Sequence, residues 1–136
     1  MQPHPDVERK ARKQARRADP RHTLGLAGEE AACAELVRRG YQILARRYRT
    51  RAGEVDLVAR DGATVVFVEV KTRVGDAYGG GAAAVTWQKR QRLARVAVEF
   101  LARSGQSNAP CRFDVVVVTP AVVPRVEVYT HAFILE

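Results

Sequence analysis

Two short stretches decide the fold of this chain: Gly53-Glu54-Val55-Asp56-Leu57-Val58-Ala59 and Val65-Val66-Phe67-Val68-Glu69-Val70-Lys71. The second is an apolar, β-branched run into which a carboxylate and then an ammonium are inserted. Such a run predicts a strand buried on both faces, because a strand with one solvated face would alternate with polar residues throughout. Asp61-Gly62 lies between the stretches and favours a tight hairpin, so we expect two antiparallel neighbours.

The hairpin places two acidic residues at comparable distances from its turn. Asp56 and Glu69 should therefore lie near the same end of the strand pair, provided that the register has no bulge, and Lys71 shares a face with Glu69. A buried, unpaired carboxylate costs roughly several kcal/mol. Asp56 cannot neutralise Glu69, but the two can share a divalent cation, and with the lysine they are the groups needed for metal-assisted phosphodiester hydrolysis. The alternative is a solvated strand face with a cross-strand ion pair.

The remaining pattern predicts an α/β protein with a mixed β-sheet flanked by helices. A helical repeat of apolar residues ends at Gly40, and a second helix begins after Thr86, which suits an N-cap. Pro124 marks the start of a final edge strand. The expected strands span residues 41–48, 54–60, 64–71, 112–119 and 126–134. The element order is thus α-β-β-β-α-β with an additional C-terminal strand.

Composition divides the chain into a basic arm and one domain. Residues 1–22 carry seven basic against three acidic side chains and almost nothing apolar, which predicts a segment that is disordered or a lone frayed helix. This arm either adds sequence-independent phosphate contacts or is dispensable. Residues 23–136 should fold as a single domain, because the length is enough for one core and too short for two.

The charge balance favours a polyanion as partner. The chain has 23 Lys and Arg against 15 Asp and Glu, a net charge of +8 and a pI of about 10.2. Nucleic acid is the commonest such partner, although a basic surface can simply increase solubility. We expect no membrane association, because no apolar run approaches the roughly 20 residues of a membrane helix. We expect a cytoplasmic protein, because the charged N-terminus does not resemble a secretory signal. The two cysteines, Cys33 and Cys111, do not have metal-site spacing, and they fit a reducing compartment.

Together these motifs resemble the PD-(D/E)XK nuclease superfamily, and more closely the bacterial UPF0102 (YraN-like) family, which is related to archaeal Holliday junction resolvases. The resemblance spans about residues 23–119 and implies a restriction-endonuclease-like fold. It is carried by Gly28-Glu29, Gly40-Tyr41 with Ile43-Leu44, the stretch 53–73, Lys89-Arg90-Gln91-Arg92-Leu93 and Arg112-Phe113-Asp114-Val115-Val116. The combination is specific to that family, although no single motif is.

The resemblance also implies roles for individual residues. Asp56, Glu69 and the backbone carbonyl of Val70 would bind Mg²⁺ or Mn²⁺, hard cations that take oxygen ligands. Lys71 would hold or deprotonate the attacking water and stabilise charge on the phosphorus. Glu29 would complete the metal shell from the first helix; alternatively, its carboxylate is only favoured by the positive end of that helix.

Several basic residues are candidates for phosphate contacts. We expect Lys89 and its neighbours on the polar side of the second helix, where a solvated surface is the alternative. Glu54 could support a second ion, but an ion pair with Arg49 or Arg51 is expected. The candidates for phosphate contacts are Arg49, Arg51, Arg73, Lys89, Arg90 and Arg92.

Two further residues have structural explanations that outrank functional ones. Asp114 lies in a buried strand and should pair with Arg112 or Arg73 rather than act in catalysis. Trp87 could stack on an unpaired base, but packing in the core or an interface is expected.

The leading functional hypothesis is a metal-dependent endonuclease acting on DNA, and only the resolvase resemblance points to a branched junction as substrate. Resolvases of this kind act as two-fold dimers, and the sequence neither requires nor excludes a homodimer. The first alternative is a nucleic-acid-binding module of the same fold with weak or no turnover, which acts with a DNA-processing partner. The second is an RNA-directed nuclease, which uses the same chemistry and differs in groove shape and 2′-hydroxyl contacts.

Overall fold

The computed structural model describes residue 6 and residues 20–74 and 86–133. In chain order the elements are α2 (Pro20–Arg38), β1 (Gln42–Thr50), β2 (Gly53–Asp61), β3 (Thr64–Thr72), α3 (Trp87–Arg103), β4 (Cys111–Thr119) and β5 (Arg125–Phe133). This order confirms the predicted α/β fold, including the additional C-terminal strand. Helix α2 begins at Pro20, inside the predicted arm of residues 1–22, and the rest of that arm lies outside the described residues except for residue 6.

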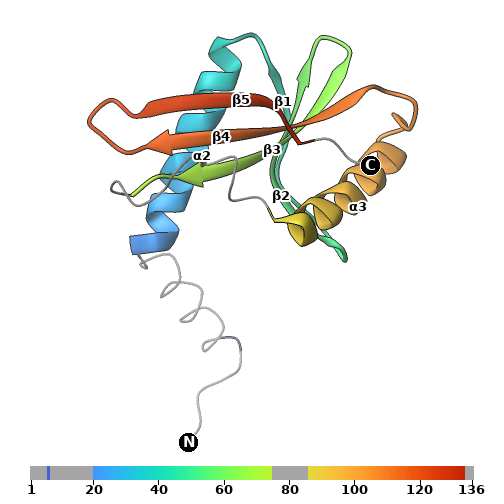
Figure 1. Ribbon diagram of the computed structural model, residues 1–136, viewed down its shortest axis with the longest axis horizontal. Coiled ribbons are helices and arrows are strands. Elements are labelled where there is room, and N and C mark those ends of the chain that lie inside the picture. Colours follow the sequence, from blue (N-terminus) through green and yellow to red (C-terminus); the bar gives the residue numbers. More distant parts are fainter. Residues whose placement is uncertain (1–5, 7–19, 75–85, 134–136) are drawn as a thin grey trace, which may run out of the picture.

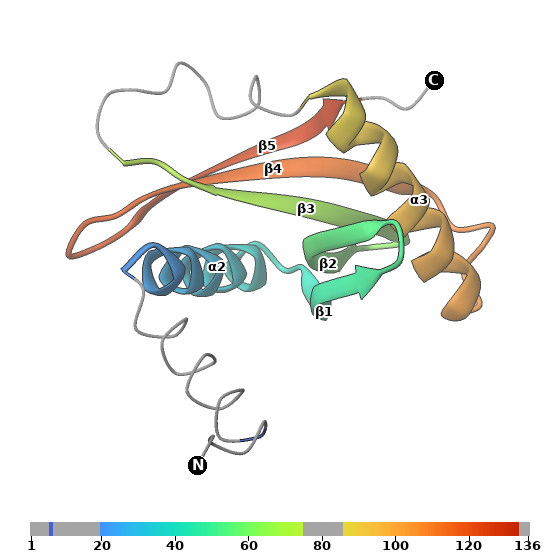
Figure 2. The same cartoon turned by 90° about the horizontal axis from the view of Figure 1, so that it is seen from below.

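The five strands form one mixed sheet in the order β1-β2-β3-β4-β5. Strands β3 and β4 are parallel, and every other neighbouring pair is antiparallel. Helix α2 covers one face of the sheet and α3 covers the other (Figure 1 and Figure 2). No helix in the described part of the chain combines the length and the apolar character that crossing a membrane requires.

The central strands are buried on both faces, as their continuous apolar sequences predict. Along β3, Val65 and Phe67 pack in the cluster under α3, whereas Val66 and Val68 pack in the cluster under α2. Strand β4 alternates in the same way. Alternation of side chains across a strand therefore distributes one apolar run between two cores.

Helix α3 is held on the sheet by an apolar stripe and a capped first turn. Its buried residues are Leu93, Val96, Ala97 and Leu101. Thr86 is the N-cap, as predicted, and its side chain accepts a hydrogen bond of 3.2 Å from the Lys89 N–H. This packing decides which residues of the first turn of α3 reach the sheet.

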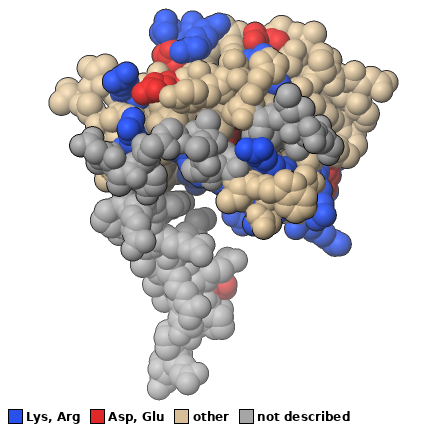
Figure 3. All heavy atoms as spheres, in the orientation of Figure 1, with Lys and Arg blue, Asp and Glu red and all other residues tan. Residues whose placement is uncertain are grey.

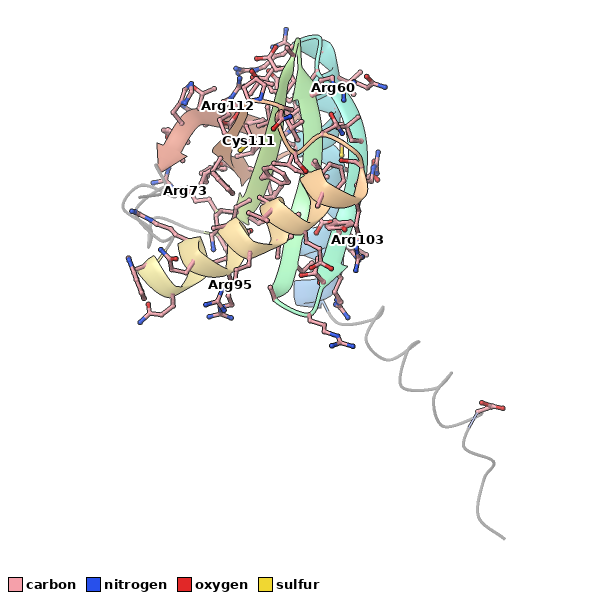
Figure 4. The ribbon with its side chains drawn as sticks, turned by 90° about the vertical axis from the view of Figure 1, so that its right-hand side faces the viewer. Arg60, Arg73, Arg95, Arg103, Cys111 and Arg112 are labelled. Carbon is pink, nitrogen blue, oxygen red and sulfur yellow. The ribbon has the colours of Figure 1, made fainter. Side chains whose placement is uncertain are left out.

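A buried polar network fixes the first half of β4. Asp114 is completely buried, and the Arg112 Nε donates to both of its carboxylate oxygens at 3.1 and 3.2 Å. The backbone N–H of His131 donates to the same carboxylate, where the register of β4 and β5 shifts. The predicted structural pairing of Asp114 with Arg112 is confirmed; Figure 4 shows Arg112 toward the opposite end of the sheet from Arg73.

Candidate functional site

The centre of the candidate site consists of Asp56, Glu69, Lys71 and Lys89, and it lies where β2 and β3 separate. Their register runs from Asp61↔Thr64 to Leu57↔Val68, and Asp56 and Glu69 follow directly after its last pair. Beyond this point the Asp56 Oδ2 accepts the Val70 N–H at 2.7 Å, so a side chain replaces the backbone acceptor of the ladder. The hairpin thus brings Asp56 and Glu69 to the same end of the strand pair, as predicted.

The alternation of β2 is also interrupted at this point. Val55 packs in the cluster under α3, whereas Leu57, two residues later, packs in the cluster under α2. In a regular strand both would face the same side. The irregularity turns the Asp56 carboxylate toward the Val70 amide.

Asp56 is electrostatically perturbed. Burial raises its pKa to about 7, the negative charge of Glu69 acts in the same direction, and the hydrogen bond from Val70 opposes both. The charge of Glu29 adds a smaller contribution that also raises the pKa of Asp56. Two adjacent acidic groups that resist simultaneous ionisation are a suitable place for a cation.

Glu69 is buried and contacts two lysines. Its side chain is 9% exposed, and its Oε1 accepts a hydrogen bond from the Lys89 Nζ and lies 3.8 Å from the Lys71 Nζ. Burial lowers the pKa of Lys71, and the neighbouring charge of Lys89 lowers it further. Burial also acts to lower the pKa of Lys89, but the hydrogen bond and charge of Glu69 outweigh it, so that this pKa is raised.

The position of Lys89 corrects the expectation that it lies on the polar side of its helix. Lys89 precedes Leu93 by four residues and Val96 by seven, so it lies on the buried face of α3 and points to Glu69. Its location in the first turn is a second signal, because the positive end of a helix disfavours a cation without a nearby carboxylate. Both signals are present in the sequence.

Glu29 lies near the centre but is held by another residue. Its carboxylate pairs with Arg47 Nε at 2.8 Å. The preceding Gly28 lets α2 approach the end of β3, since a Cβ there would overlap the Thr72 hydroxyl. Within residues 20–74 and 86–133, no three acidic, histidine or cysteine side chains form a group that could hold a metal. Glu29 therefore stays a predicted ligand.

Arg47 is a residue that the sequence pattern did not indicate. It interrupts the regular conformation of β1 with a φ of 50°, opposite the segment of β2 that carries Asp56. Residues other than glycine rarely adopt this backbone conformation, and no feature of the alternating sequence pattern predicts it.

The basic residues predicted to contact phosphate are distributed over several elements. Arg49 pairs with Glu54 at 2.8 Å, which confirms the expected ion pair of Glu54. Arg51 and Arg92 are exposed, whereas Arg73 and Arg90 are half-buried. On the face shown in Figure 3, Lys and Arg side chains form separate patches between acidic and uncharged residues.

Trp87 does not pack in the core. It is 68% exposed at the start of α3, so the predicted core position within this chain is wrong. It lies one residue after the N-cap, before the apolar stripe of α3 begins at Leu93.

Comparison with known proteins assigns the chain to a family. The profile described as "Uncharacterised protein family UPF0102" matches residues 28–118. The chain belongs to the UPF0102 family. A UPF0102 protein of Symbiobacterium thermophilum is 56% identical over 97 residues, which cover 71% of this chain and 82% of the relative. A UPF0102 protein of Geobacter sulfurreducens is 46% identical over 112 residues, which cover 81% of this chain and 88% of the relative.

The UPF0102 match confirms the family resemblance found in the sequence. It includes Glu29 and the residues of the centre, Asp56, Glu69, Lys71 and Lys89, and it ends before β5. The predicted basic arm, residues 1–22, lies entirely outside the match, which begins at residue 28. The description of the UPF0102 family names no activity, so the function has to be argued from the site.

Proposed function

We propose that this protein is a metal-dependent endonuclease that hydrolyses phosphodiester bonds in DNA. The observation that carries the proposal is the meeting of Asp56 and Glu69 where β2 and β3 separate, with Lys71 and Lys89 at the same carboxylate. Burial and the adjacent charge of Glu69 raise the pKa of Asp56 to about 7, and acids with strongly shifted pKa values concentrate at functional sites.

The donor groups fit Mg²⁺ or Mn²⁺. Asp56, Glu69 and the backbone carbonyl of Val70 would supply oxygen ligands, which hard divalent cations prefer to nitrogen and sulfur. The mutual repulsion that raises the pKa of Asp56 is the feature that a bound cation would remove. When bound, the ion would act as a Lewis acid on the phosphate and make water more acidic.

Lys71 is suited to hold the attacking water and to stabilise the charge that develops on the phosphate. Its Nζ lies 3.8 Å from the Glu69 Oε1, so the ammonium is next to the acids that would bind the metal. Burial and the neighbouring Lys89 lower its pKa, which makes proton exchange at this nitrogen easier than for an exposed lysine. Glu29 would join the metal ligands with a carboxylate that also pairs with Arg47 through its Oε2.

DNA as the substrate is supported by the net charge of +8 and by the resemblance to nucleases that process branched DNA. Arg51 on the β1–β2 turn and Arg92 on α3 are exposed and available for phosphate contacts. A four-way junction is the substrate shape that we propose to test first.

The proposal is tested by cleavage of end-labelled four-way junction, flap, duplex and single-stranded DNA with Mg²⁺ or Mn²⁺. The wild type is assayed beside Asp56→Asn and beside Glu30→Gln, a matched control on α2 whose side chain is 69% exposed and pairs with Arg46. Cleavage that Asp56→Asn loses and Glu30→Gln keeps would support the proposal. Cleavage that Asp56→Asn retains would refute it. The same substrates made of RNA distinguish an RNA-directed enzyme.

A second candidate function is a nucleic-acid-binding module without turnover, which acts with a DNA-processing partner. It is favoured by one observation: Lys89 already neutralises Glu69 without a metal. Binding of the junction without cleavage of any substrate would select this candidate.

A further inference from the structure

Lys89 is an unusual neighbour for a metal-binding carboxylate. It comes from the first turn of α3, where the helix dipole disfavours a cation and where the turn itself has no acidic residue to compensate it. Its compensation is Glu69 on β3, which accepts a hydrogen bond from the Lys89 Nζ. The ammonium thus occupies one of the two carboxylate oxygens that could bind a metal.

The need for such a partner follows from burial. Glu69 is 7% exposed, and an ionised carboxylate at this depth is costly unless a positive charge lies against it. Lys71 is 3.8 Å from the same oxygen, which is longer than a hydrogen bond. A chain that folds before it binds a metal therefore requires a cation of its own, and among the described residues Lys89 is in direct contact with Glu69.

We propose that Lys89 is an exchangeable internal counter-ion: it holds Glu69 while no metal is bound, and a divalent cation displaces it toward the substrate phosphate. The inference rests on the proposed function, because it takes Glu69 as a metal ligand. The Lys89 side chain is 34% exposed, so it has a path to solvent, whereas Glu69 has almost none. Its charge is unchanged throughout, and only its partner changes from a carboxylate to a phosphate.

The exchange has two consequences. Lys89 and the metal compete for Glu69, so removing the ammonium should raise metal affinity. When the metal displaces Lys89, its ammonium also becomes available at the centre to bind a phosphate. By linkage, a phosphate that binds the displaced Lys89 should in turn favour metal binding. Lys89 would therefore couple the occupation of the metal site to the binding of the substrate.

The first test is calorimetric titration of the full chain with Mn²⁺ alone. The variants are Lys89→Gln and, as a matched control, Arg95→Gln, which removes one charge from the same helix at a side chain that points away from the sheet (Figure 4). Lys89→Gln should bind Mn²⁺ at least tenfold more tightly than the wild type, and Arg95→Gln should differ from it by less than twofold. Equal Mn²⁺ affinities of Lys89→Gln and the wild type would overturn the exchange but leave the proposed function intact. If neither the wild type nor either variant bound Mn²⁺, the metal-dependent function itself would be refuted.

A second test uses the wild type and does not depend on the folding of a variant. The chain has four lysines, Lys10, Lys13, Lys71 and Lys89, so amine acetylation can be followed at each by mass spectrometry. Saturating Mg²⁺ should increase the acetylation rate of Lys89 several-fold relative to Lys10 and Lys13, because the ammonium leaves Glu69. An unchanged or lower rate at Lys89 would overturn the proposal.

Discussion

Replacing Asp56 by asparagine should stabilise the metal-free protein at pH 8. Burial and the adjacent charge of Glu69 raise the pKa of Asp56 to about 7. Above that pH the folded state must hold a carboxylate in an unfavourable environment, whereas the unfolded chain ionises the same group without this cost. Asparagine removes the charge, and its side-chain oxygen can still accept the Val70 N–H.

The size of the effect follows from the pKa. A rise from the ordinary 3.8 to about 7 corresponds to about 4 kcal/mol of destabilisation at pH 8, at about 1.4 kcal/mol per pH unit. Solvent near the pair reduces this figure, so we expect Asp56→Asn to gain about 2 kcal/mol.

The sign of the pH dependence follows from the same shift. Because the folded state binds the proton of Asp56 more tightly than the unfolded state, this group's contribution to stability decreases as the pH rises from about 4 to about 7. It is then constant above that window. The advantage of Asp56→Asn over the wild type should therefore shrink by about 1 kcal/mol between pH 8 and pH 6.

The assay is urea unfolding followed by circular dichroism, with EDTA, at pH 6 and pH 8. Glu54→Gln is the matched control, because Glu54 is an acid of the same strand whose ion pair with Arg49 is exposed. Its free energy of unfolding should stay within about 0.5 kcal/mol of the wild type. Lower stability of Asp56→Asn than of the wild type at pH 8, or a difference that does not change with pH, would refute the reasoning.

Three further predictions concern other parts of the molecule. Lys71→Met should reduce metal-dependent cleavage by about 100-fold while the calorimetric Mn²⁺ affinity changes little, and loss of metal binding would contradict its assigned role. Arg112→Met should lower the free energy of unfolding by about 3–5 kcal/mol, because Asp114 would be left buried and without this partner; a loss below 1 kcal/mol in urea would argue against that network. Deleting residues 1–19, which leaves α2 complete, should flatten the salt dependence of DNA binding, and an unchanged slope would show that the arm makes no phosphate contacts.

Contacts between residues close in sequence were predicted correctly from the sequence. The ion pair of Glu54 with Arg49 joins neighbouring strands across one short turn. The pairing of Asp114 with Arg112 lies within one strand, and the Thr86 cap lies within one helical turn. In each case the local backbone geometry alone limits the distance between the partners.

Contacts that depend on the placement of a helix were not predicted. Trp87 was expected in the core or an interface, and its exposure excludes the core position within this chain. Lys89 was expected on the polar side of α3, and it contacts Glu69. The pairing of Glu29 with Arg47 requires both the approach of α2 at Gly28 and an irregular conformation in β1. None of these distances is limited by a short stretch of chain.

The sequence by itself determined the family, the order of the elements and the meeting of Asp56 with Glu69. The reason is that a tight hairpin transmits its register along both strands, so two residues equally far from the turn meet without reference to the rest of the fold. Only the tertiary structure decided that the ladder ends at these residues and that Lys89 reaches Glu69 from the helix packed on the sheet. The packing of Leu93, Val96 and Ala97 on the sheet positions that helix.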